Sequence, residues 1–253
     1  MCIRDRCYQF EDVHFAYNEA EVLHGISFQT QPGTMTAIVG PSGSGKSTIA
    51  KLMAGFWDVT SGTVHFGGQD IRSIPFGQLM GEISYVAQDN FLFDKSIREN
   101  IRMGNPNASD GEVEAAAKAA NCHDFIMQLE QGYDTMAGDA GDRLSGGERQ
   151  RITIARAMLK QASVIILDEA TAYADPENEA LIQQAISKLV VGKSLIVVAH
   201  RLNTIRNADQ ILVVANGEIV GRGIQEELLE NCPLYRKMWQ DYAGSTEGGV
   251  EDV

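Results

Sequence analysis

Nine consecutive residues of this chain have the types and the spacing of a phosphate-binding loop. They are Gly40, Pro41, Ser42, Gly43, Ser44, Gly45, Lys46, Ser47 and Thr48. This order fills the pattern GxxxxGK[ST]. Glycines allow successive backbone N–H groups to turn inward around phosphate oxygens, and the helix expected after the loop directs its positive end at them. We expect Lys46 to reach the β and γ phosphates of a nucleotide and the Ser47 hydroxyl to ligate Mg²⁺.

Two adjacent acids that follow a buried apolar run could complete a phosphate-transfer site. Residues 164–167 are Val-Ile-Ile-Leu, and Asp168 and Glu169 come directly after them. Open α/β sheets bind ligands at the carboxyl ends of such strands. Asp168 would hold Mg²⁺ through water, and Glu169 would polarise the attacking water. Solvated charges at a strand end are the alternative interpretation, which the phosphate loop upstream disfavours.

A second helix start with anion-binding character lies about a hundred residues beyond the loop. Residues 144–151 read Leu-Ser-Gly-Gly-Glu-Arg-Gln-Arg. Ser145 and the N–H groups of Gly146 and Gly147 open a predicted helix, and such a helix start attracts negative charge. Two phosphate-binding helix starts so far apart suggest a site that is completed by another copy of the domain.

The three motifs together resemble the ATP-binding-cassette (ABC) ATPases, in the order phosphate loop, signature motif and acidic strand. Residues 144–151 match the signature motif, and the resemblance extends over about Tyr8 to Tyr242. It implies an α/β fold with a RecA-like, mostly parallel core sheet, an antiparallel β subdomain and an inserted helical subdomain. It also implies that ATP and Mg²⁺ are bound and that ATP is hydrolysed. Two domains would sandwich ATP, with each phosphate loop facing the partner copy's signature motif.

The same resemblance assigns roles to four further residues. Tyr17 matches the aromatic residue that stacks on adenine, and Gln88 matches the Q-loop glutamine that touches Mg²⁺ and the attacking water. His200 matches the switch histidine at the γ-phosphate, and Asp175 matches the aspartate of the D-loop. Family members usually read Ser-Ala-Leu before that aspartate, whereas residues 172–174 are Ala-Tyr-Ala. The residues expected beside the D-loop contact across a dimer therefore differ from the family pattern, while the aspartate is kept.

A further loop resembles a feature of exporter-type ABC transporters. Residues 135–141 are similar to the X-loop, from which Ala137 and Asp139 are small departures. The resemblance implies a motor domain whose partner is a membrane domain, fused on its N-terminal side, at the cytoplasmic face of the cell membrane. Residues 168–179 look like those of exporter-fold transporters that import iron-siderophores; drug or lipid export is the alternative.

Two other functions are open to this family. One is an ABC ATPase that acts on nucleic acid or ribosomes, but such proteins usually carry long insertions or two cassettes. A formal net charge of -13 over 253 residues also disfavours binding to a phosphate backbone. The other is a regulatory cassette without hydrolysis, which typically lacks the glutamate or the histidine; Glu169 and His200 are both present.

The hydrophobic pattern predicts the elements that must position these residues. Alternating apolar residues from Tyr8 to Phe28 indicate antiparallel strands. Short apolar runs predict buried strands, and a glycine-rich loop separates the first of these strands from a helix. Strands that alternate with helices favour a doubly wound parallel sheet. These strands are Met35–Val39, Val164–Leu167, Ser194–Val198 and Gln210–Val214, and the helices cover 46–53, 121–130 and the segment from Pro176. A capping box, Ser109 with Glu112, opens another helix.

Composition and length fit one large domain. We expect residues 1–6 to be an assembly remnant, 7–240 to form the domain and 241–253 to be a disordered tail. Within the domain, the core would cover about 7–90 and 161–240, and the helical subdomain about 91–160. The longest aliphatic runs are far shorter than the ~20 residues of a membrane span. Four cysteines without a CxxC pair support neither a disulfide framework nor a zinc site.

Overall fold

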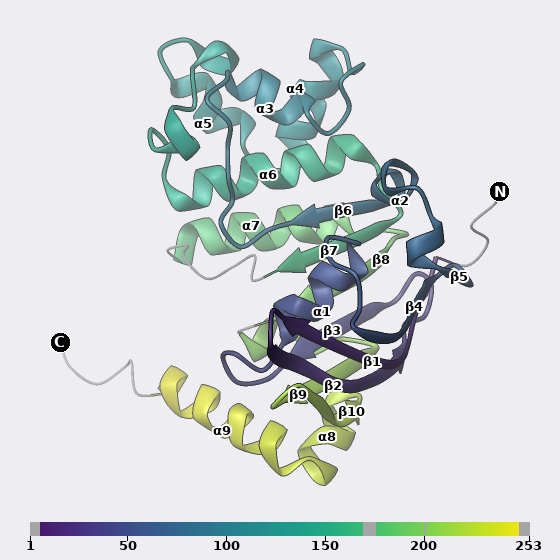
Figure 1. Cartoon of the computed structure of the whole chain (residues 1–253). Helices are drawn as coiled ribbons and strands as arrows, with labels where there is room; N and C mark the ends of the chain where they lie inside the picture. The colour runs from purple at the N-terminus through teal and green to yellow at the C-terminus, as the bar shows by residue number, and fades with distance from the viewer. Residues whose placement is uncertain (1–5, 169–175, 200, 248–253) are drawn as a thin grey trace. The chain divides into compact units, whose positions relative to one another are not determined.

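The computed structural model describes residues 6–168, 176–199 and 201–247, and the chain divides into two compact units (Figure 1). The first unit falls within Met1–Gly81 and Ser194–Val253, and the second is Glu82–Lys193. Among the described residues, no helix combines the length and the apolar character that a membrane span requires.

An antiparallel sheet forms one part of the first unit. Its strands lie in the order β2 (Ala20–Gln29), β1 (Tyr8–Tyr17), β4 (Ser61–Phe66) and β5 (Gln69–Asp70). Alternate side chains of β1 are buried, and Phe10 pairs with Phe28 of β2, with ring centroids 4.4 Å apart. This arrangement confirms the antiparallel strands predicted from the alternation, because successive side chains of a strand point to opposite faces.

The second sheet of this unit is built around a central parallel strand. β3 (Met35–Val39) lies between β8 (Ser194–Val198) and β9 (Gln210–Ala215) and is parallel to both. β10 (Glu218–Gly223) adds to β9 as an antiparallel edge. β3 and most of β8 and β9 are buried, as their continuous apolar runs predict for strands covered on both faces. The predicted strands are confirmed to within one residue.

Helices complete the first unit. α1 (Lys46–Met53) follows β3 with the predicted bounds. The unit also contains α8 (Gln225–Asn231), the short turns Ile71–Ser73 and Leu202–Ile205, and α2 (Phe76–Glu82) except for Glu82, with which the second unit begins. α9 (Pro233–Glu247) packs Trp239 and Tyr242 against the core. This packing carries the helix past residue 240, so the boundary expected there falls inside α9, and its residues 241–247 are helical rather than part of a tail.

The second unit combines a strand pair with helices. β6 (Ile83–Val86) is parallel to β7 (Val164–Asp168), which runs one residue beyond the predicted strand. The helices are α3 (Ile97–Arg102), α4 (Asp110–Ala119), α5 (His123–Gln128), α6 (Gly146–Lys160) and α7 (Pro176–Leu189), with short 3₁₀ turns at Gly132–Asp134 and Asp139–Gly141. The Ser109–Glu112 capping box is confirmed, whereas α5 is shorter than predicted. Residues 91–160 all lie in this unit, which also holds both strands and α7.

Two buried tyrosines of the first unit allow a matched test of polar burial. The Tyr8 hydroxyl donates to the Met53 carbonyl at 2.9 Å, whereas the Tyr235 hydroxyl has no hydrogen-bond partner in the described part of the chain. Burial raises the pKa of Tyr235 to about 12. We expect Tyr8→Phe to lower the free energy of unfolding by about 1 kcal/mol, because a hydrogen bond is lost. Tyr235→Phe should leave it unchanged or raise it, because an uncompensated buried hydroxyl is removed. Urea unfolding followed by circular dichroism measures both, and the reverse order would contradict this account.

Candidate functional site

The phosphate loop joins β3 to α1, and its outer side packs directly on neighbouring backbone and side chains. Gly40 has φ 151°, and a Cβ built on it would lie 1.9 Å from the Val214 carbonyl oxygen of β9. Gly45 has φ 103°, and its Cβ would lie 2.7 Å from a methyl carbon of Leu23 in β2. The backbone contact excludes a side chain at Gly40, and the positive φ of Gly45 favours glycine there.

A turn from the far end of the sequence also supports the loop. The Gly217 N–H, between β9 and β10, donates to the Ser44 carbonyl at 3.2 Å. The Gly217 carbonyl accepts in turn from the His24 N–H of β2 at 2.9 Å. The loop is therefore tied through one turn to β2. The sequence motif did not predict this contact, because it joins residues far apart in the chain.

Donors gather at the inner side of the loop. The Lys46 ammonium is buried and donates to the carbonyl oxygens of Gly40 at 3.0 Å and Pro41 at 2.8 Å. The Ser44 hydroxyl is buried and has no hydrogen-bond partner in the residues that the structure describes. Gly45, the N-cap of α1, offers no side-chain acceptor to the first turn of that helix. The Lys46 cation, the unpaired Ser44 hydroxyl and the uncapped start of α1 together fit a polyanionic ligand such as a nucleoside triphosphate.

Tyr17 belongs to an aromatic cluster in the same unit. It lies at the end of β1, with ring centroids 4.7 Å from Phe15 and 5.5 Å from Trp57, both nearly perpendicular to it. The Trp57 side chain is half exposed. Such rings present flat apolar faces that can stack on a base. Sequence reasoning missed Trp57, which follows α1 outside any periodic pattern.

Asp168 and Gln88 lie in the second unit. Asp168 ends β7 and is 4% exposed, and its Oδ2 accepts a hydrogen bond from the Tyr85 hydroxyl at 2.7 Å. Gln88 is exposed on the loop after β6, where its backbone carbonyl accepts from the Asn90 amide at 3.2 Å. The carboxylate of Asp168 and, in the first unit, the hydroxyl of Ser47 are hard oxygen donors of the kind that Mg²⁺ takes. Sequence reasoning did not single out Tyr85.

The signature segment starts α6 with the predicted cap. Ser145 is exposed, and its hydroxyl accepts from the Glu148 N–H at 3.3 Å in a capping box. Gly147 is buried, and a Cβ there would lie 2.9 Å from the Asn178 side chain of α7. Arg151 donates to the same Asn178 and lies over the Phe125 ring at 5.0 Å. These contacts fix the start of α6 against α7 and α5.

The predicted X-loop packs against the same helix. A Cβ on Gly141 would lie 2.8 Å from Cδ of Arg149 and 3.2 Å from Leu92 in the loop after β6. Arg149 donates to the carbonyl oxygens of Gly141 at 3.3 Å and Leu144 at 2.5 Å. The X-loop, the loop that carries Gln88 and the signature helix are thus in mutual contact within one unit.

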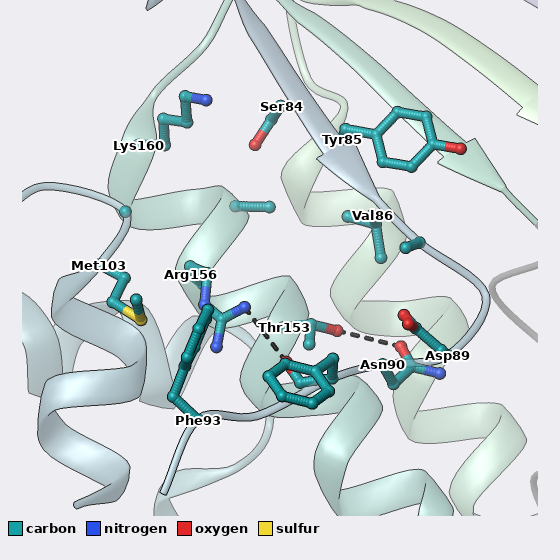
Figure 2. A pocket seen from close by; sticks show the side chains of 14 residues that line it. Ser84, Tyr85, Val86, Asp89, Asn90, Phe93, Met103, Thr153, Arg156 and Lys160 are labelled. Atoms are coloured by element: carbon teal, nitrogen blue, oxygen red, sulfur yellow. Dashed lines mark hydrogen bonds between the residues drawn. The ribbon is translucent and has the colours of Figure 1, made fainter. Parts of the chain in front are cut away.

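A pocket of about 290 Å³ opens between β6, the loop that follows it and α6 (Figure 2). On its wall, the Thr153 hydroxyl donates to the Asn90 side chain at 3.1 Å, and Arg156 donates to the Phe91 carbonyl at 3.4 Å. The pocket therefore shares its lining with the loop of Gln88. Glu169, Asp175, His200 and residues 172–174 lie outside the described residues, so their predicted roles stay predictions.

Comparison with known proteins gives a consistent result. Residues 23–172 match the family profile described as ABC transporter. The mycobactin import ATP-binding/permease protein IrtA of Mycolicibacterium smegmatis is 50% identical over 232 residues, which cover 91% of this chain and 27% of that protein. ATP-binding cassette sub-family B member 6 of Homo sapiens is 48% identical over 240 residues, covering 94% of this chain and 28% of that protein.

A solved structure agrees with the sequence comparisons. A bacterial Atm1-family ABC exporter with ATP bound matches this chain with a TM-score of 0.92 and 40% identity, over 96% of this chain and 43% of that one. This match confirms the α/β fold class predicted from the sequence. The chain spans less than a third of the length of the two relatives above.

The unpaired hydroxyl of Ser44 gives the phosphate loop a specific test. We expect Ser44→Ala to leave the melting temperature without nucleotide unchanged or higher, because a buried hydroxyl without a partner is removed. The affinity for ATP should fall by about 10-fold or more, because a hydrogen bond to a charged group contributes about 1.5–3 kcal/mol. Thermal unfolding and equilibrium binding of ATP measure the two effects.

The matched control for that variant is Thr36→Val. The Thr36 hydroxyl, on β3 before the loop, is also buried and also lacks a partner among the described residues. Its removal should not change the affinity for ATP. Equal losses of affinity in both variants, or no loss in Ser44→Ala, would show that Ser44 does not face the bound phosphates.

Proposed function

This chain belongs to the ABC transporter family as an ATPase domain, and we propose that it is the motor of a membrane transporter. Two copies of the domain, identical or paralogous, would close around ATP and separate after hydrolysis. The observation that carries the proposal is the phosphate loop, where Lys46 and the unpaired Ser44 hydroxyl lie within a loop that admits no side chain at Gly40. The names of the relatives, which include a permease and an exporter, do not favour a non-transport ATPase.

ATP would be bound by the Lys46 ammonium and by backbone N–H donors of the first unit. Lys46 would exchange its bonds to the loop carbonyls for oxygens of the β and γ phosphates, while the first turn of α1 supplies further N–H donors. Tyr17, with Trp57 beside it, would stack on adenine. Ser47 and Gln88 would contact Mg²⁺, and Asp168 would hold it through water; the cation would supply charge that neutralises the developing negative charge.

Hydrolysis would need three groups beyond the binding loop. Glu169 would accept a proton from the attacking water, and His200 would contact the γ-phosphate. Ser145 and the N–H groups of Gly146 and Gly147 from a second copy would contribute the opposite wall. The close packing of Gly147 on the Asn178 side chain, at the start of α6, supports this role. A donor that stabilises a transition state must be held in place before the reaction. Asp175 is proposed to lie at the same contact between copies.

We also propose that the pocket beside the Q-loop receives a segment of the membrane domain. Phe91, Phe93 and Met103 line it and are each about two-fifths exposed. Burial lowers the pKa of Arg156 and that of Lys160, which also line the pocket. An apolar segment that carries an acidic residue would complement both features. The domain would then work at the cytoplasmic face of the membrane.

The proposed cargo is an iron-siderophore, imported by an exporter-fold transporter. Residues 168–179 carry the resemblance, and the name of one relative specifies mycobactin import. Drug or lipid export is the alternative. Transmembrane segments choose the cargo in such transporters, so the coding sequence upstream of this domain and uptake of radiolabelled ferric siderophore by cells that carry the whole gene would decide between them.

Replacement of Glu169 tests the catalytic assignment. We expect Glu169→Gln to lower the rate of ATP hydrolysis by about 100-fold or more, because general base catalysis contributes 10²–10⁴-fold. ATP binding should persist, and ATP should now stabilise a dimer that size-exclusion chromatography detects. Glu230→Gln, at an exposed position of α8, is the control and should behave as the unmodified protein. Full turnover in Glu169→Gln would contradict the assignment.

Phe93 tests the contact with the membrane domain. In the isolated domain, Phe93→Asp should leave ATP hydrolysis unchanged, because the Phe93 ring contacts Phe91 and its backbone is hydrogen-bonded to Asn100, neither of which has an assigned catalytic role. In the full-length transporter, reconstituted in liposomes, the same change should abolish substrate-stimulated hydrolysis, since a charge would enter an apolar contact. Phe76→Asp, at a phenylalanine of α2 that is 56% exposed against 43% for Phe93 and lies outside the pocket lining, should change neither activity. Intact stimulation in Phe93→Asp would refute the proposed contact.

A further inference from the structure

The Tyr85 hydroxyl reaches the acid that ends the neighbouring strand. β6 and β7 are parallel, with Tyr85 paired to Ile166, two residues before Asp168. The hydroxyl donates to Oδ2 of Asp168 at 2.7 Å. Figure 2 shows the Tyr85 ring turned away from Thr153 and Arg156, although its strand borders the pocket. The Tyr85 side chain is therefore directed at Asp168, at the end of the neighbouring strand.

This hydrogen bond constrains a side chain that otherwise rotates easily. The terminal torsion of an aspartate has a broad energy profile, so the backbone of β7 alone does not fix the plane of the carboxylate. Asp168 is 4% exposed, and a buried carboxylate needs hydrogen-bond donors to offset its lost hydration. A bond of 2.7 Å from a hydroxyl to a carboxylate is among the stronger hydrogen bonds in proteins.

We propose that Tyr85 is a positioning residue that orients Asp168 for Mg²⁺, an inference that rests on the proposed ATPase function. The phenol holds one oxygen of the carboxylate and thereby sets the direction in which the group meets the hydrated cation. Groups that orient a metal-binding side chain in this way typically change metal affinity by about 10–100-fold when they are lost. Tyr85 does not touch ATP in this account; it acts through Asp168.

The position of Tyr85 also links the metal side of the site to the Q-loop. Gln88 follows three residues later, directly beyond the end of β6. One strand end therefore places both the residue that orients Asp168 and the glutamine proposed to contact Mg²⁺. A displacement of this strand end would change both at once.

Tyr85→Phe tests the proposal, because it removes one oxygen atom and keeps the ring. Binding of a fluorescent ATP analogue is measured as a function of Mg²⁺ concentration, and separately in EDTA. We expect the Mg²⁺ concentration for half-maximal effect to rise about 10-fold, while affinity in EDTA stays unchanged. The rate of hydrolysis at saturating Mg²⁺ should stay within about threefold of the unmodified protein, since the catalytic groups remain.

Tyr133→Phe is the matched control. Its hydroxyl lies 2.8 Å from Nδ1 of His123 in the same unit, so this variant also loses a tyrosine hydroxyl contact. This variant should leave the Mg²⁺ dependence of ATP binding unchanged, and its only expected effect is a lower melting temperature. An unchanged Mg²⁺ midpoint in Tyr85→Phe, or an equal loss of affinity in EDTA, would overturn the proposal. If Mg²⁺ does not change the affinity of the unmodified protein for ATP, the proposal is overturned; if the unmodified protein binds no ATP with or without Mg²⁺, the proposed function fails instead.

Discussion

The approach of Gly40 to the Val214 carbonyl is the constraint on which the nucleotide site depends. Because no side chain fits between them, the start of the phosphate loop lies against the backbone of β9. Gly45, with φ 103°, lies against the Leu23 side chain of β2, and the Gly217 N–H donates to the Ser44 carbonyl of the loop. Backbone contacts on the outside keep the inner N–H groups, Lys46 and the Ser44 hydroxyl in a fixed arrangement. A site that binds charge by preorganised donors needs such rigidity, since reorganisation would cost affinity.

In the second unit, close packing likewise fixes the start of the signature helix α6. Gly147 leaves room only for the Asn178 side chain, and Arg151 holds that side chain from the next turn of α6. Arg149 then ties the X-loop to the helix through the Gly141 carbonyl. Close packing transmits displacement because interiors contain few voids. A movement of the X-loop or of Leu92 would therefore reach the start of α6 directly.

Local sequence patterns predicted the motifs and the strands and helices that carry them, but not the contacts between distant segments. The strand β3, the helix α1 and the Ser109–Glu112 cap follow from residues close together in the chain, so their signals are contained in short windows. Tyr85 and Asp168 are 83 residues apart, and only the parallel register of β6 and β7 brings them together. α9 extended further than its composition suggested, because Trp239 and Tyr242 pack on the core and override the weak local preference of the glycine-containing segment.

The acidity of the chain and its polyanionic ligand are compatible because the donors are local. A net charge of -13 opposes ATP at long range, but salt screens such fields beyond about 10 Å. At the loop, Lys46 is buried beside backbone donors, where the effective dielectric constant is low and each interaction is stronger than in water. The affinity would therefore depend on the geometry of a few residues rather than on a basic surface. A divalent cation adds charge only where a carboxylate is oriented to receive it, which makes the hydrogen bond between Tyr85 and Asp168 part of the same electrostatic arrangement.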